Sequence, residues 1–218
     1  MTIGSRPLVI LLGFLAALAP LSAQSKQEAV NCSYDQNSML QLDQFTFDQD
    51  DKLGWRKLGD RPECRNEAAK VIDLYIKRHE KELSRKWLVP SFRWHEAGMR
   101  AMAGDTRQAI RVMRQSLKPL KGPEGADTWT AYAEAWNEYV NASIAFLERD
   151  LEALTAARTR LAALPVPSDF AEVDGSAVGH APVWPQNLDV VDGLIACFGK
   201  PYEEAYGSAE CRAAGQKR

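Results

Sequence analysis

The chain has 218 residues, with 27 Lys and Arg against 29 Asp and Glu and a formal net charge of −2 at pH 7. This length suffices for one domain with a sizeable buried core. The near-neutral charge, spread without any basic block, argues against a nucleic-acid-binding protein.

Residues 1–23 have the pattern of a secretory signal peptide. Arg6 supplies a positive charge, residues 8–18 are apolar, and small residues precede the end of the segment at Ala23. The apolar run is shorter than the roughly 20 residues that a membrane span needs. No Cys follows directly after Ala23, so no lipid anchor is expected. We therefore predict cleavage after Ala23, a periplasmic or secreted protein, and no membrane insertion of the mature chain.

The sequence contains four cysteines. An even number in an exported chain favours two disulfides, for which three pairings exist. We expect Cys32–Cys64 and Cys197–Cys211, because each pair joins sequence neighbours and holds one terminal segment. A metal site is the weaker interpretation, because the chain has no Cys-x-x-Cys motif and only three histidines. No metal or other cofactor is expected.

Helical periodicity dominates from about residue 45 to residue 164. Apolar residues recur at steps of three and four, as on one face of a helix, whereas period-two strand patterns are nearly absent. Gly104-Asp105 and the segment 121–125 interrupt the pattern and predict turns. The clearest apolar stripe consists of Ala68, Val71, Ile72, Tyr75 and Ile76.

Residues 165–187 are rich in Pro and Gly and form either a functional loop or a linker. After them, the pattern predicts two short helices clamped by Cys197 and Cys211. The chain is thus expected to comprise a signal peptide (1–23), a helical-hairpin domain (24–164), this loop (165–187) and a C-terminal helical element (188–218).

One segment resembles a tetratricopeptide repeat. Gly104-Asp105 stands where that repeat turns between its two helices, and Ala109-Ile110 and Leu117 follow at matching positions. Gly permits the tight turn, and the small Ala lets the second helix approach the first. The resemblance implies an array of antiparallel helical hairpins.

Two poorer matches surround Asp60 and Asp150. Asp60, Asp105 and Asp150 are equally spaced, at an interval longer than the usual repeat period. In the match at Asp150, Arg149 replaces the Gly of the turn. We therefore predict an all-α, tetratricopeptide-like fold of three helical hairpins, with a generic bundle of antiparallel helices as the alternative.

No catalytic or metal-binding motif is complete. His95 lacks the second His of a zinc-protease helix, because Met99 stands at that position, and His79 fails in the same way. The acidic residues at 48–51 lack the Gly and Glu of a calcium loop and fit a helix N-terminus better. His180 lies in the Pro-rich loop near several acids, but no nucleophile motif accompanies it.

The candidate binding residues follow from the resemblance. Peptides lie along the first helices of a tetratricopeptide array, which would place Trp94, Trp136 and Tyr139 on one concave wall. Arg56 and Lys57 would lie at one end of that wall. Aromatic rings beside cations suit an extended peptide or its carboxylate. The alternative is that the three rings belong to the core.

We expect a non-catalytic module that binds a protein or peptide of unknown identity. Two alternatives stay open: a hydrolase of cell-envelope polymers with residues from the 165–187 loop, and an inhibitor or immunity-type partner of another protein. Segments 47–50 and 54–56 also resemble small exported proteins of Gram-negative bacteria, which implies no activity.

Overall fold

The structure is a computed structural model that describes Met1 and residues 31–124, 128–170 and 183–216. The predicted signal peptide, apart from Met1, and residues 171–182 of the Pro- and Gly-rich loop lie outside the described residues. From Cys32 onward the chain forms one compact unit. Helices are the only regular secondary structure in these described ranges, which confirms the all-α prediction.

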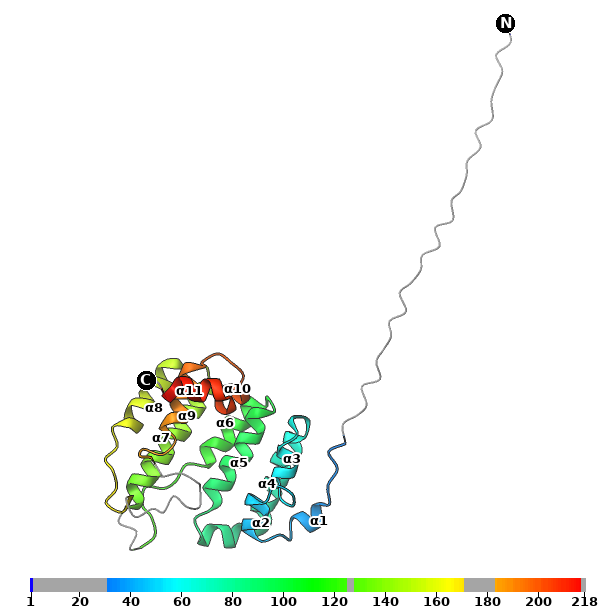
Figure 1. Cartoon of the computed structure of the whole chain (residues 1–218). Helices are drawn as coiled ribbons and strands as arrows, with labels where there is room; N and C mark the ends of the chain where they lie inside the picture. Colours follow the sequence, from blue (N-terminus) through cyan, green and yellow to red (C-terminus); the bar gives the residue numbers. More distant parts are fainter. Residues whose placement is uncertain (2–30, 125–127, 171–182, 217–218) are drawn as a thin grey trace. The chain divides into compact units, whose positions relative to one another are not determined.

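Three consecutive helices pack side by side: α4 (Arg65–Arg85), α5 (Val89–Met102) and α6 (Thr106–Gln115). Short turns make neighbours antiparallel, and α5 contacts both α4 and α6 (Figure 1). The apolar stripe predicted for α4 is buried, as expected when one face of an amphipathic helix leaves water. This buried stripe consists of Ala68, Val71, Ile72, Tyr75 and Ile76.

The turn between α5 and α6 is the one predicted at Gly104-Asp105. Gly104 is left-handed, with φ of 81°, and the amide of Asp105 donates to the carbonyl of Arg100, as in a Schellman helix end. The Asp105 side chain then accepts from the backbone N–H of Gln108 and caps α6. The turn between α4 and α5 also has a left-handed residue, Trp87, with φ of 57°.

The second predicted hairpin consists of α7 (Trp129–Leu147) and α8 (Leu151–Ala162). The turn between α7 and α8 matches the turn between α5 and α6. Arg149 is left-handed, with φ of 61°, and Asp150 caps α8 by accepting from the backbone N–H of Ala153. The two hairpins therefore turn in the same way although only one of them has Gly at the turn.

The C-terminal helices pack onto the rest of the unit. α9 (Leu188–Ala196) contacts α7 and α8, α10 (Tyr202–Gly207) contacts α5, and α11 (Ala209–Gln216) contacts α9. The Cys197–Cys211 disulfide joins the end of α9 to α11, with Cα atoms 5.7 Å apart. The structure confirms this predicted pair and the clamp it forms. The two short helices expected here are three, because the backbone is extended at Ser208, between α10 and α11.

The N-terminal part differs from the expectation. Before α4 lie α1 (Gln36–Met39), α2 (Gln44–Gln49), α3 (Arg56–Gly59) and a 3₁₀ turn at Pro62–Cys64. The prediction of a hairpin around Asp60 is wrong. The helix before Asp60, α3, is a single turn, and the chain then passes at Pro62 into the 3₁₀ turn. α4 pairs with α5 instead.

The Cys32–Cys64 disulfide ties the start of this unit to the 3₁₀ turn before α4, with Cα atoms 5.4 Å apart. It is the second of the two predicted pairs. Two disulfides indicate a location outside the reducing cytoplasm.

Two clusters of buried residues fill the unit, and α5 contributes to both. Phe92 and Met99 pack with residues of α2, α3 and α4. Trp94, Ala97 and Ala101 pack with residues of α6, α7 and α8. α5 therefore separates an N-terminal cluster from a larger C-terminal cluster.

Candidate functional site

The three aromatic residues selected from the sequence contact one another. The ring centroid of Trp94, on α5, lies 4.6 Å from that of Tyr139 and 5.8 Å from that of Trp136, both on α7. Trp136 and Tyr139 are 6.1 Å apart. These tilted and edge-to-face arrangements are the ones aromatic pairs prefer, and they join α5 to α7.

Burial places two of these rings in the core. Trp94 is 7% exposed and Tyr139 is 2% exposed. The Tyr139 hydroxyl shares a 2.8 Å hydrogen bond with that of Tyr206, and burial raises the pKa of Tyr139 well above its usual value. Trp94 and Tyr139 are thus core residues, the alternative left open by the sequence. Trp136 is half-buried and keeps an accessible part.

The connection between α6 and α7 is held against α7, because side chains of α7 form hydrogen bonds with the backbone of the connection. Trp136 Nε1 donates to the Ser116 carbonyl at 2.7 Å. The Asn137 amide brackets Lys118, because its oxygen accepts from the Lys118 N–H at 2.8 Å and its nitrogen donates to the Lys118 carbonyl at 2.9 Å. Lys118 is therefore fixed at its backbone on both sides.

The same connection covers the first turn of α7. Trp129 Nε1 donates to the Pro119 carbonyl at 2.8 Å. A Cβ added at Gly122 would lie 2.2 Å from Cγ of Trp129, so the backbone at Gly122 can approach the ring only because that residue lacks a side chain.

The Lys118 ammonium lies between two indole rings. Its Nζ is 4.3 Å from the ring centroid of Trp136 and 5.8 Å from that of Trp129, within the range of cation–π attraction. Burial lowers the pKa of Lys118. No carboxylate in the described part of the chain forms an ion pair with it.

Trp87 extends this arrangement to the surface. Its ring meets that of Trp129 edge-on, with centroids 5.1 Å apart, and 36% of the residue is exposed. Two leucines that flank Lys118 in the sequence are also exposed. We call this set of residues the tryptophan–lysine surface; it comprises Trp87, Leu117, Lys118, Leu120, Trp129 and Trp136.

Arg56 and Lys57 lie elsewhere, on α3, which packs against α4. Arg56 Nε donates to the Asp48 carbonyl at 2.5 Å, and its guanidinium lies 4.7 Å from the ring centroid of Trp55. Lys57 lines a cleft of about 210 Å³. The structure does not bring these two cations to the rings of Trp94, Trp136 and Tyr139, because α3 packs in the N-terminal cluster. The other apolar and basic lining residues of the cleft include Met39, Leu42, Lys52, Leu53 and Leu58.

Asp48 and His95 form a carboxylate–imidazole pair. Asp48 Oδ1 lies 2.7 Å from His95 Nδ1 and accepts from Trp55 Nε1 at 2.9 Å. Burial by itself would raise the pKa of Asp48. Hydrogen bonds from His95 and Trp55 and the positive charge of Arg56 outweigh burial and hold this pKa below its usual value. Hydrolases orient His through such a pair. Within the described ranges, however, no Ser, Thr or Cys side chain hydrogen-bonds to His95. The contact that the pair makes is between α2 and α5.

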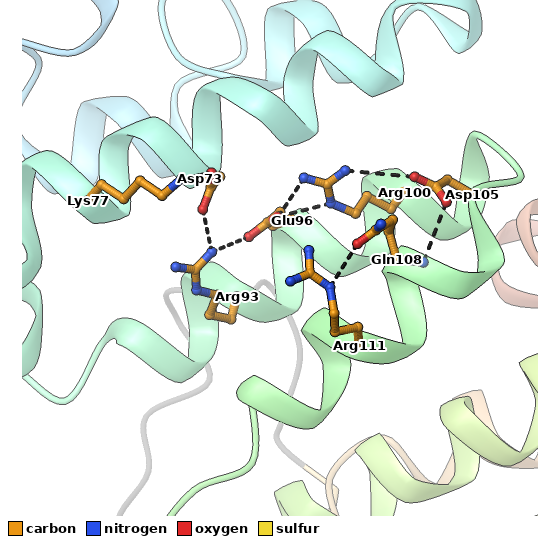
Figure 2. Close-up of polar contacts among 8 residues, drawn as sticks. All are labelled: Asp73, Lys77, Arg93, Glu96, Arg100, Asp105, Gln108 and Arg111. Atoms are coloured by element: carbon orange, nitrogen blue, oxygen red, sulfur yellow. Dashed lines mark hydrogen bonds and ion pairs between the residues drawn. The ribbon is translucent and has the colours of Figure 1, made fainter.

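A charge network connects α4, α5 and α6 (Figure 2). Glu96, which is 1% exposed, accepts from Arg93 at 2.5 Å and from Arg100 at 2.8 Å and 2.9 Å. Arg93 also donates to Asp73 of α4 at 2.8 Å, and Arg100 lies 3.8 Å from Asp105 at the turn into α6. Two guanidinium groups compensate the cost of burying one carboxylate. We assign this network to helix packing.

Sequence reasoning selected Trp136 but missed Trp87, Lys118 and Trp129. These three residues lie in turns or at a helix start, where periodicity carries no information. One signal was present: Lys118 is the single charge in an otherwise apolar stretch, Leu117 to Leu120, between two helices.

Comparisons add no known relative. No protein-family model matches the chain, and no match is found among characterised proteins or solved structures. Across the described ranges, no three His, Cys, Asp or Glu side chains are grouped to hold a metal ion. No helix there is both long and apolar enough to cross a membrane. His180, considered for a hydrolytic site, lies outside the described residues.

Proposed function

We propose that the protein is a non-catalytic binding module that works in the periplasm or outside the cell and holds a protein or peptide on the tryptophan–lysine surface. The two disulfides support an oxidising compartment. The matching turns at Gly104 and Arg149 support stacked hairpins of the tetratricopeptide kind. Hairpins of that kind commonly present an extended binding surface.

The observation that carries this proposal is the conformation and exposure of Trp87. It is a bulky residue in the left-handed conformation, which costs an L-residue about 1–2 kcal/mol. Its ring is exposed yet held in place by Trp129. The left-handed backbone ends α4, because the amides of Trp87 and Leu88 donate to the carbonyls of Ser84 and Leu83. The feature that points to a ligand is therefore the exposed ring, which stands where Gly would turn the chain without strain. Tryptophan is also enriched among residues that dominate binding energy.

A selection experiment tests the proposal. Short random peptides displayed on phage are selected against the purified oxidised protein, and the dissociation constants of the enriched peptides are measured. Trp87→Ala should weaken their binding by roughly thirtyfold, which corresponds to a hot spot of about 2 kcal/mol. The matched control is Leu151→Ala, which truncates an exposed apolar residue on α8 and should leave binding unchanged. Peptides that bind Trp87→Ala as well as the wild type would refute the proposal.

A further inference from the structure

We infer that the ligand of the tryptophan–lysine surface is a peptide segment in which a carboxylate lies beside an apolar side chain, and that Lys118 binds the carboxylate. The inference rests on the proposed function. The carboxylate has two possible sources, an Asp or Glu side chain or the C-terminus of the peptide, and both offer the same chemistry to an ammonium group.

The position of the Lys118 ammonium costs free energy. Its charge is partly removed from water and faces two indole rings, yet the described residues supply no anion to it. Two other partly buried cations, Arg93 and Arg158, have carboxylate partners in Glu96 and Asp192. Cation–π attraction offsets part of this cost, and a bound carboxylate would offset the rest.

The backbone that carries the Lys118 side chain is already held in place. Asn137 holds the Lys118 backbone on both sides, and Trp136 is itself held by its bond to Ser116. A ligand therefore loses little free energy to ordering of this surface, and preorganisation of this kind raises affinity. The lowered pKa of Lys118 agrees with a charge that lacks its counterion.

Exposed apolar side chains indicate the chemistry of the rest of the ligand. Leu117 and Leu120, close to Lys118 in the sequence, are exposed, and so is Trp87, which packs on Trp129; exposed apolar side chains are thus available to a ligand of this surface. The surface has one ammonium and no guanidinium fork, which suits a singly charged carboxylate better than a phosphate. The complementary segment is an acidic group next to an aliphatic or aromatic side chain.

Three fluorescent peptides with the same apolar residues test the inference by anisotropy. The first has an internal Glu and an amidated end, the second has Gln and a free C-terminal carboxylate, and the third has Gln and an amidated end. At least one acidic peptide should bind the wild type roughly tenfold more tightly than the neutral one, as expected for a charge-assisted hydrogen bond. The peptide that binds better identifies the source of the carboxylate.

Variants separate Lys118 from charge in general. Lys118→Met keeps the apolar stem and should bind the acidic peptide no better than the neutral one, whereas Lys118→Arg should retain part of the preference. Lys121→Met removes the same charge from an exposed neighbour and should change affinity less than twofold. Equal losses in Lys118→Met and Lys121→Met would overturn the inference.

The remaining outcomes distinguish the two proposals. If acidic and neutral peptides bind the wild type equally and Trp87→Ala abolishes both, the proposed function stands and the inference falls. If none of the three peptides binds the wild type, the inference falls, and the peptides enriched on phage decide the proposed function. A measurement on the unaltered protein guards against a misfolded variant: NMR of the Lys118 side chain should show its pKa rising with the acidic peptide, and an unchanged pKa would count against the inference.

Discussion

Gly104 and Arg149 occupy equivalent positions in two helical hairpins and share the left-handed conformation, with φ of 81° and 61°. In both turns the next residue is an Asp that caps the following helix. Gly adopts this conformation without steric cost, whereas Arg does not. The α7–α8 turn therefore stores strain that the α5–α6 turn lacks.

Arg149→Gly should stabilise the protein. Removing the strain of the left-handed Arg outweighs the added flexibility of the unfolded chain, and we expect the free energy of unfolding to rise by about 1 kcal/mol. Urea denaturation measures this change. The reverse control is Gly104→Ala, where an added Cβ meets nothing within 4 Å. It should destabilise by about 1 kcal/mol through φ alone; a neutral result in both variants would contradict the strain argument.

Glu96→Gln should destabilise the protein severely. It removes the charge that Arg93 and Arg100 share in a buried position, and breaking a buried pair costs about 3 kcal/mol. The control is Glu67→Gln, which removes a surface pair with Lys70 and should change stability by less than about 0.5 kcal/mol. Equal effects of the two variants would show that Glu96 contributes no more than a surface charge.

The two disulfides should open in order. Cys32 is half-buried, whereas Cys211 is fully buried and Cys197 nearly so, so a mild reductant should reach the Cys32–Cys64 pair first. Alkylation followed by peptide mass mapping identifies the opened pair. Each bridge should contribute about 3 kcal/mol to stability in the chain-entropy estimate. Opening of Cys197–Cys211 first under native conditions would contradict the burial argument.

Trp94→Ala and Trp87→Ala should separate core from surface. Trp94 packs against Tyr139 in the core, so its truncation should cost about 3–5 kcal/mol of stability. Trp87 is exposed and strained, so its truncation should cost less than about 1 kcal/mol. Thermal unfolding compares the two variants. A large fall in melting temperature for Trp87→Ala would mean that this residue serves folding.

Asp48 should make stability sensitive to acid. Burial opposes ionisation of Asp48, but His95 and Trp55 stabilise the anion and the pKa lies below its usual 3.8. A lowered pKa stabilises the folded state above the pKa of the unfolded chain, at about 4, and this contribution is lost as the pH falls through the lower folded-state value. The stability gap between the wild type and Asp48→Asn should therefore narrow as the pH falls below about 4. A constant gap in urea denaturation would refute this.

Local patterns in the sequence determined the helices and the cysteine pairs. The buried stripe of α4 follows from its three- and four-residue periodicity, and the turn at Gly104-Asp105 follows from the conformational freedom of Gly. Cys197 and Cys211 were paired because they are neighbours among the cysteines and hold the terminal segment. The hairpin around Asp60 was predicted wrongly, although Pro62 was a local signal against it: the helix before Asp60 is a single turn, and a 3₁₀ turn follows.

Only the tertiary structure decided which aromatic side chains are accessible. Trp94 and Trp136 both lie on helices that the sequence predicts, yet one lies in the core and the other contacts Lys118. The difference arises because the connection after α6 folds back over α7, held by Trp136 and Asn137 through bonds to backbone far away in the sequence. Periodicity reports on one helix at a time, whereas the surroundings of Lys118 depend on how three segments meet.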